Sequence, residues 1–161
     1  MCAKSIIFYT FAAKMTNMKQ ITIKVAWNNS AFEGLVSSET SYGEMKIVTK
    51  DFNDIIDMGE AELKIGFDGY TEFGLELPEW YKNKEYEFVY KFQDVTAMLK
   101  AYSSYVSLAA ISRETGINRA LLSHYANGLK VPRNKQQKII VAGLHRIGAL
   151  LSKCTIDDER K

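Results

Sequence analysis

The sequence predicts an α+β protein in two parts, a sheet domain with one helix followed by an all-helical domain. Three observations lead to this prediction. Residues 18–49 contain three short segments in which apolar and polar residues alternate, the period of half-buried strands, and residues 51–65 change to helical spacing. After residue 93 every periodic segment has helical spacing, and the charge of the chain changes from acidic to basic.

The first domain is expected to have the element order βββαβ. Every second residue from Ile21 to Trp27 is apolar, residues 28–30 have turn composition, and residues 31–37 and 45–49 form two further short strands around a loop at 38–43. Three consecutive short strands predict an antiparallel meander. Every second residue from Tyr86 to Phe92 is aromatic, which predicts a last strand with one aromatic face.

A helix over residues 51–65 is expected between the third and fourth strands, followed by a glycine-containing loop at 67–78. Its expected buried face consists of Phe52, Ile55, Ile56, Gly59 and Leu63. The opposite face carries Asp51, Asp54, Asp57 and Glu60. Nuclease chemistry would need several carboxylates that converge on metal ions. Carboxylates repeated along one helix are typical of a solvated face instead, so no metal site is expected.

The expected domains are residues 18–93 and 94–153, with a flexible extension at 1–17 and a disordered tail at 154–161. The apolar run 5–13 is short, Lys14 follows it at once, and Phe11 stands where a small residue should precede the cleavage site of a secretion signal. Met18 is therefore the expected start of the folded part. No stretch approaches the roughly 20 apolar residues that cross a bilayer, so no membrane association is expected.

Charge is divided unevenly between the two domains. Residues 1–93 contain ten Lys and Arg against fourteen Asp and Glu, whereas residues 94–161 contain eleven against five. A basic domain joined to an acidic one favours a nucleic-acid binder attached to a part with a different partner. Cys2 and Cys154 lie far apart without metal-ligand spacing, which excludes a disulfide framework and a zinc site and favours the cytoplasm. No cofactor is expected.

Residues 104–152 have the pattern of a helix-turn-helix. Ser107 can cap a helix over 108–115, and Gly116 can end it in the left-handed conformation that a short turn between crossing helices often requires. Ile117 fills the turn, and Asn118 can cap a second helix over 119–126. The inward face of that second helix would be formed by Leu121, Leu122 and Tyr125. The alternative is a plain helical bundle with a solvated basic face.

A helix-turn-helix in this register makes specific predictions for DNA contacts. A recognition helix meets base edges with residues near its N-terminus. The residues expected there are Arg119, Ala120, Ser123 and His124. Arginine pairs with guanine and a small apolar residue contacts the thymine methyl. Phosphate contacts, which position the domain without reading sequence, are expected from Ser107, Asn127, Lys130, Arg133 and Lys135.

Two further helices frame this motif. Asp94 can cap a helix that carries Val95, Met98, Leu99 and Tyr102. The last helix, over about residues 135–152, has a stripe of Ile140, Leu144, Ile147 and Leu151. This stripe could form the interface of a homodimer or close the core of its own domain, and the sequence favours neither.

Enzymatic function is not expected. His124 and His145, the only histidines, stand in the basic half without a nucleophile motif beside them. The chain has no glycine-rich loop of the kind that holds a nucleotide.

Two family resemblances extend this interpretation. The segment SLAAISRETGINRALLSHYANGLKVP resembles the helix-turn-helix of phage-repressor-like proteins, in which residues at the positions of Arg119, Ala120 and Ser123 face bases. Residues 18–151 resemble HicB-like antitoxins, through MKQITIKVAWNNSAFEGLVSS, DFNDIIDMGEAEL, LPEWYKNKEYEFVYKFQDVTAMLKAYSSY and GLHRIGALL. Ala120 and Leu108 differ from the polar residues often found at these positions in repressors.

The HicB resemblance implies a partial ribonuclease-H-like fold for the first domain and an antitoxin function. The first domain would mask a small HicA-type RNA-cleaving toxin, and the second would bind the operator of its own genes as a homodimer or a higher oligomer. Large aromatic residues are frequent interface anchors. The candidates are Trp27, Phe32, Trp80 and Tyr81, for which core or loop packing is the alternative. The alternative function is a stand-alone transcription regulator whose first domain senses a ligand or another protein.

Overall fold

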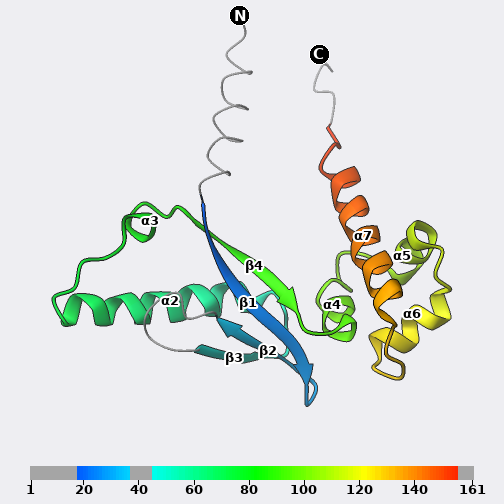
Figure 1. The fold of residues 1–161 in the computed structure, drawn as a ribbon, viewed down its shortest axis with the longest axis horizontal. Coiled ribbons are helices and arrows are strands. Elements are labelled where there is room, and N and C mark those ends of the chain that lie inside the picture. The colour runs from blue at the N-terminus through cyan, green and yellow to red at the C-terminus, as the bar shows by residue number, and fades with distance from the viewer. Residues whose placement is uncertain (1–17, 37–44, 156–161) are drawn as a thin grey trace, which may run out of the picture. The chain divides into compact units, whose positions relative to one another are not determined.

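The structure is a computed structural model that describes residues 18–36 and 45–155. Contacts divide the chain into two compact units, with the boundary in the chain between Gln93 and Asp94. Over the described residues the protein is α+β, with one four-stranded mixed sheet in the first unit and six helices in all (Figure 1). The expected extension at 1–17, the loop at 38–43 with Ser37, and the tail from residue 156 onward lie outside the described residues.

The sheet contains four strands in the order β3-β2-β1-β4. β1 (Lys19–Asn28), β2 (Ala31–Val36) and β3 (Met45–Thr49) form the expected antiparallel meander, which is confirmed. β4 (Tyr86–Phe92) pairs with β1 in parallel, with Ile21 opposite Phe88. The alternation of residues predicts a strand and its two faces but not the direction of its pairing, so the parallel contact was not predicted.

The turn between β1 and β2 has two residues with left-handed backbone. Asn29 has a φ of 48° and Ser30 a φ of 61°. Two consecutive residues with positive φ are typical of the two-residue hairpin turn whose twist matches that of the strands, and Asn-Gly is its preferred sequence. Asn29 therefore fits the turn, whereas Ser30 adopts a conformation that strains its Cβ.

Ile23 lies at the centre of the first core and is fully buried. Two glycines leave room for it, Gly34 in β2 and Gly59 in α2 (Asp54–Glu72). A Cβ at either position would lie 3.2 Å from a terminal carbon of Ile23. Figure 1 shows α2 running along the sheet. Because both glycines lack a Cβ, α2 and β2 can both pack closely against the side chain of Ile23.

The predicted bounds of this helix were wrong. α2 begins at Asp54, three residues later than expected, because Asp51 accepts a hydrogen bond from the backbone N–H of Asn53 (2.9 Å) in a turn before the helix. It continues through the predicted loop to Glu72. The buried residues recur every fourth position: Ile55, Gly59, Leu63 and Phe67. Ile56, expected on this face, is 43% exposed, and Phe52 is buried but precedes the helix.

The extension of α2 has an energetic reason. Gly66 and Gly69 suggested a loop, and each glycine costs a helix about 1 kcal/mol relative to alanine. Burying a phenylalanine stabilises by about 1.5–3 kcal/mol, and Phe67 is only 2% exposed. The helix ends at Glu72, and the φ of 69° at Gly74 just beyond it allows Leu75 N–H to donate to Tyr70 O (2.9 Å).

An aromatic cluster holds the short helix α3 (Glu79–Lys82), which was not predicted, against its unit. The ring of Phe67 lies 5.5 Å from that of Trp80 and 4.1 Å from that of Tyr81, measured between centroids. The Trp80 ring also packs edge-on against Tyr86 of β4, at 5.9 Å. These rings therefore connect α2, α3 and the first residue of β4.

The second unit consists of α4 (Val95–Ala101), α5 (Leu108–Thr115), α6 (Arg119–Ala126) and α7 (Asn134–Leu151). The bounds of α5 and α6 are as predicted, and α7 differs from the prediction by one residue at each end. Asp94 caps α4 through a hydrogen bond from Ala97 N–H to its carboxylate (2.7 Å), as expected. The unit closes around Leu99, Ile111, Leu122 and Ile140, each at most 2% exposed.

We expect Ser30→Gly to stabilise the first unit by about 0.5–1 kcal/mol, because glycine adopts positive φ without steric cost and completes the preferred Asn-Gly turn. Chemical unfolding monitored by tryptophan fluorescence would measure this, since both tryptophans lie in the first unit. Ser30→Val is the control and should destabilise the unit. Equal stability of the two variants would contradict the strain at Ser30.

Candidate nucleic-acid interface

The connection between α5 and α6 is fixed by caps at each end. Ser107 Oγ accepts a hydrogen bond from Ala110 N–H (3.2 Å) at the start of α5, and Gly116 ends that helix with a φ of 71°. Asn118 Oδ1 accepts from Ala120 N–H (2.8 Å) at the start of α6. Residues 116–118 are thus a short, fully specified connection, and the predicted caps and the left-handed glycine are confirmed.

Thr115 adds a further constraint at the connection. Its hydroxyl donates to Ile111 O (2.7 Å) and accepts from Ile117 N–H (3.3 Å). These two bonds fix the side-chain rotamer and hold the first residues of the turn against the end of α5. Ile117 itself is 9% exposed, which agrees with the prediction that it fills the turn.

Buried groups on three sides hold α6 in place. Leu122 and Tyr125 are buried, as predicted, whereas Leu121 is only half-buried. The Tyr125 hydroxyl donates to Gln136 Oε1 of α7 (2.7 Å), and Thr96 Oγ1 of α4 donates to Tyr125 O (2.8 Å). Tyr125 therefore connects α6 to both α4 and α7.

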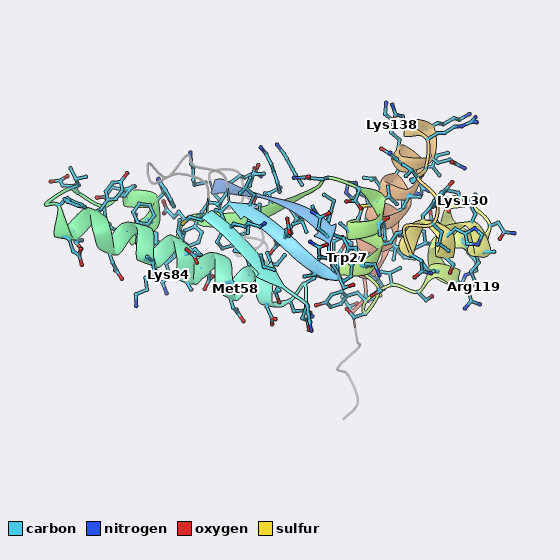
Figure 2. The ribbon with its side chains drawn as sticks, turned by 90° about the horizontal axis from the view of Figure 1, so that it is seen from below. Trp27, Met58, Lys84, Arg119, Lys130 and Lys138 are labelled. Carbon is cyan, nitrogen blue, oxygen red and sulfur yellow. The ribbon has the colours of Figure 1, made fainter. Side chains whose placement is uncertain are left out.

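Opposite that buried face, α6 presents residues expected to read bases. Arg119 and Ala120 are exposed, and Ser123 and His124 are half-buried. Figure 2 marks Arg119 at the beginning of α6, with its side chain extending outward from the ribbon. All four belong to one eight-residue helix, so the structure brings together the set that the sequence analysis selected.

The residues expected to contact phosphates surround the two ends of α6 in the chain. Ser107, Asn127, Lys130, Arg133 and Lys135 are all exposed. Ser107 uses its oxygen as a helix cap, and Asn127 donates a long hydrogen bond to Ser123 Oγ (3.4 Å). The hydroxyl proton of Ser107 and the second amide proton of Asn127 have no recorded acceptor among residues 94–155. Figure 2 marks Lys130 in the segment after α6.

The cations of this unit are mostly without acidic neighbours. Arg146 pairs with the carboxylate of Glu114 and donates a second hydrogen bond to Glu114 O (3.1 Å). This ion pair joins α5 to α7. No ion pair is recorded in the described residues for Arg119, Lys130, Arg133 or Lys135. Unpaired cations on one small domain are the electrostatic signature of a nucleic-acid binder.

Two further exposed cations were missed as contact candidates. Arg113 on α5 and Lys138 on α7 also make no recorded ion pair within residues 94–155. Both contribute to the positive charge of this region. The helix-turn-helix pattern did not point to them, because it concerns positions around α6. Leu129 and Val131, on either side of Lys130, are 71% and 86% exposed and were not singled out either.

The four aromatic candidates of the first unit pack against rings of that unit. Phe32 is 4% exposed, and the Trp27 ring packs edge-on against it at 4.7 Å. Trp80 and Tyr81 are half-buried in the aromatic cluster around Phe67. Burial raises the pKa of the Tyr81 hydroxyl, and the charge of Asp68 adds to this increase. All four therefore make packing contacts in their unit, and a role of Trp27, Trp80 and Tyr81 at an interface stays a prediction.

Other kinds of site were sought in the same residues. Across residues 18–36 and 45–155, no three His, Cys, Asp or Glu side chains come close enough together to hold a metal ion. Asp51, Asp54, Asp57 and Glu60 are all exposed. No helix in the described part of the chain combines the length and the apolar character needed to span a membrane.

Comparisons of the chain with protein-family models, with curated proteins and with solved structures gave no match. The case for a function therefore depends on the geometry and charge of the residues themselves.

The packing of α7 on α5 predicts opposite effects for two glycines of one helix. A Cβ at Gly143 would lie 2.5 Å from Thr115 Cγ2, whereas nothing lies within 4 Å of a Cβ at Gly148. Because Thr115 is held by two hydrogen bonds, Gly143→Ala should destabilise the second unit by about 1–2 kcal/mol, the cost of overpacking exceeding the gain in helix propensity.

Gly148→Ala is the matched control and should stabilise by about 0.5–1 kcal/mol, since alanine loses less backbone entropy in a helix. Thermal unfolding followed by circular dichroism at 222 nm measures both variants. If both alanines raise the melting temperature, the close approach of α7 to Thr115 is wrong.

Proposed function

We propose that this protein is a HicB-like antitoxin and autorepressor, whose second unit binds its own operator and whose first unit binds and masks a small RNA-cleaving toxin. The observation that carries the proposal is the α5–α6 pair. Two short helices, capped by Ser107 and Asn118 and joined through a left-handed glycine, expose Arg119 and Ala120 at the start of the second helix. This is the arrangement expected of a helix-turn-helix and its recognition helix.

Charge supports DNA as the ligand of this unit. Arg119 is exposed at the helix end that meets base edges, and the unpaired cations Lys130, Arg133 and Lys135 follow α6 in the chain. In this proposal Arg119 reads a guanine, Ala120 contacts a thymine methyl, and the other cations bind phosphates. Ser123 and His124 lie further along the same helix and complete the base-reading set.

The antitoxin part of the proposal depends on the first unit. Its longer elements follow the order βββαβ, which the resemblance to HicB-like antitoxins implies together with a partial ribonuclease-H-like fold. The described structure contains no clustered metal-binding side chains in this unit, and we propose that it acts by binding and not by catalysis. The exposed thiol of Cys154 fits the reducing cytoplasm, where we place the protein.

We further propose that operator binding requires a homodimer. Two recognition helices about 34 Å apart match successive major-groove faces of a palindrome. The apolar stripe of α7 divides into two parts. Ile140 is fully buried in its own unit, whereas Leu151 and its neighbour Leu150 are 59% and 68% exposed. The first part closes the core, and the exposed end is available to a second copy.

Substitutions in the basic unit should separate base reading from phosphate binding. Arg119→Ala should weaken binding to a fragment from upstream of the gene by roughly 1–3 kcal/mol and leave binding to random DNA nearly unchanged. Lys130→Ala should weaken both equally and reduce the slope of log K against log salt by about 1. Fluorescence anisotropy titrations measure both effects. Lys64→Ala, an exposed lysine of α2, is the control. Unchanged operator affinity in Arg119→Ala would reject the assignment of α6.

The antitoxin function makes a prediction in cells. Expression of the small open reading frame beside this gene should stop growth, and co-expression of this chain should restore it, because the masked toxin can no longer cleave RNA. Growth curves with and without this chain measure the effect, and the two proteins should co-purify. A harmless neighbour that does not co-purify would refute the antitoxin function and leave a stand-alone DNA-binding regulator.

A further inference from the structure

The side of α2 that faces away from the sheet carries a continuous exposed stripe. Six of its members are spaced three or four residues apart, and a seventh, an aspartate, lies three residues after the first. All seven therefore lie on one face of the helix. This outer stripe consists of Asp54, Asp57, Met58, Ala61, Ile65, Asp68 and Glu72, all exposed to solvent. Figure 2 marks Met58 on α2.

Apolar residues occupy the centre of the outer stripe. Met58 is 36% and Ile65 is 65% exposed, with Ala61 between them. The exposed apolar surface continues past the end of the helix, where Phe73 is 77% and Leu75 is 53% exposed. Among the described residues of this unit, the large exposed apolar side chains belong to α2 and the segment after it, with the single exception of Val48. Several exposed apolar side chains along one element make it a candidate interaction surface.

Acidic residues occupy both ends of the outer stripe. Asp54 and Asp57 lie at one end and Asp68 and Glu72 at the other, and the one cation of α2, Lys64, lies at the edge of the stripe, four residues before Asp68. No recorded ion pair in residues 18–36 and 45–93 involves these four carboxylates. Asp54 accepts a hydrogen bond from Thr49 Oγ1 (2.8 Å). An apolar centre between acids that make no recorded ion pair fits a partner whose surface is apolar in the middle and basic around it.

We propose that the outer stripe of α2 is the surface with which the first unit holds the small basic protein that it masks. The inference rests on the proposed antitoxin function and assigns it a surface. An RNA-cleaving protein carries cations for the phosphates of its substrate, so acids around an apolar contact both attract it and compete with RNA. The four aromatic candidates contact rings of their own unit, whereas the side chains of the outer stripe are exposed to solvent among the described residues.

The dimensions of the stripe fit a partner of small-domain size. α2 has 19 residues and is therefore about 28 Å long, close to the diameter of a small domain. Phe73 and Leu75 extend the contact beyond the helix. Ile65, the most exposed apolar residue of the stripe, lies in its middle, where the residues that dominate binding energy are usually found.

Two variants of the full chain test the surface, with the purified product of the small open reading frame beside this gene as the probe. Ile65→Ser should raise the dissociation constant about tenfold or more by removing the apolar anchor. Asp68→Lys should slow association and weaken its dependence on salt. Surface plasmon resonance at two salt concentrations measures both effects.

Matched controls lie on the same helix outside the stripe. Ile56→Ser and Glu60→Lys make the same two changes at exposed positions and should leave the dissociation constant within about twofold. Operator affinity and helix content should be unchanged in all four variants, which shows that each is folded. If the wild-type chain binds the probe and the stripe variants bind as tightly, the stripe is refuted while the antitoxin function stands. If the wild-type chain does not bind, the antitoxin function falls and this inference with it.

Discussion

The left-handed backbone at Gly116 is the constraint on which the proposed DNA interface depends. A φ of 71° ends α5 within one residue, and Asn118 can then start α6 two residues later. A residue with a Cβ would strain this conformation by about 1–2 kcal/mol, although the space around Gly116 is open. The requirement at this position is thus for backbone freedom. The short connection turns the polar side of α6 outward while Leu122 and Tyr125 stay in the core.

Local chemistry made much of the fold predictable. Caps at Asp94, Ser107 and Asn118 and the glycine at 116 act over three or four residues, so the second unit could be predicted almost to the residue. The first unit was predicted less well because its elements depend on distant partners. The parallel pairing of β4 with β1 and the continuation of α2 to Phe67 both result from packing between segments far apart in the chain.

The same distinction applies to the sites. Exposure of Arg119 and Ala120 follows from helical spacing once Leu122 and Tyr125 are known to face inward, so the sequence was sufficient. The outer stripe of α2 could not be recognised while the helix was thought to end near residue 65. Aromatic residues alone do not predict an interface, since a large ring is equally useful in a core and at a contact surface. The ring contacts of Trp80 and Tyr81 show packing within their own unit, and their role toward a partner stays a prediction.

Tyr125 has a consequence for the cost of binding. Its hydroxyl donates to Gln136 of α7, and its backbone oxygen accepts from Thr96 of α4. The C-terminal turn of α6 is therefore already held in place in the free protein. Conformational entropy that a flexible helix would lose on DNA has already been lost during folding. The entropy that remains to be lost belongs to a few long cationic side chains. In the proposed complex with DNA, affinity would therefore depend on the rigidity of residues such as Tyr125 that lie in the core of the unit.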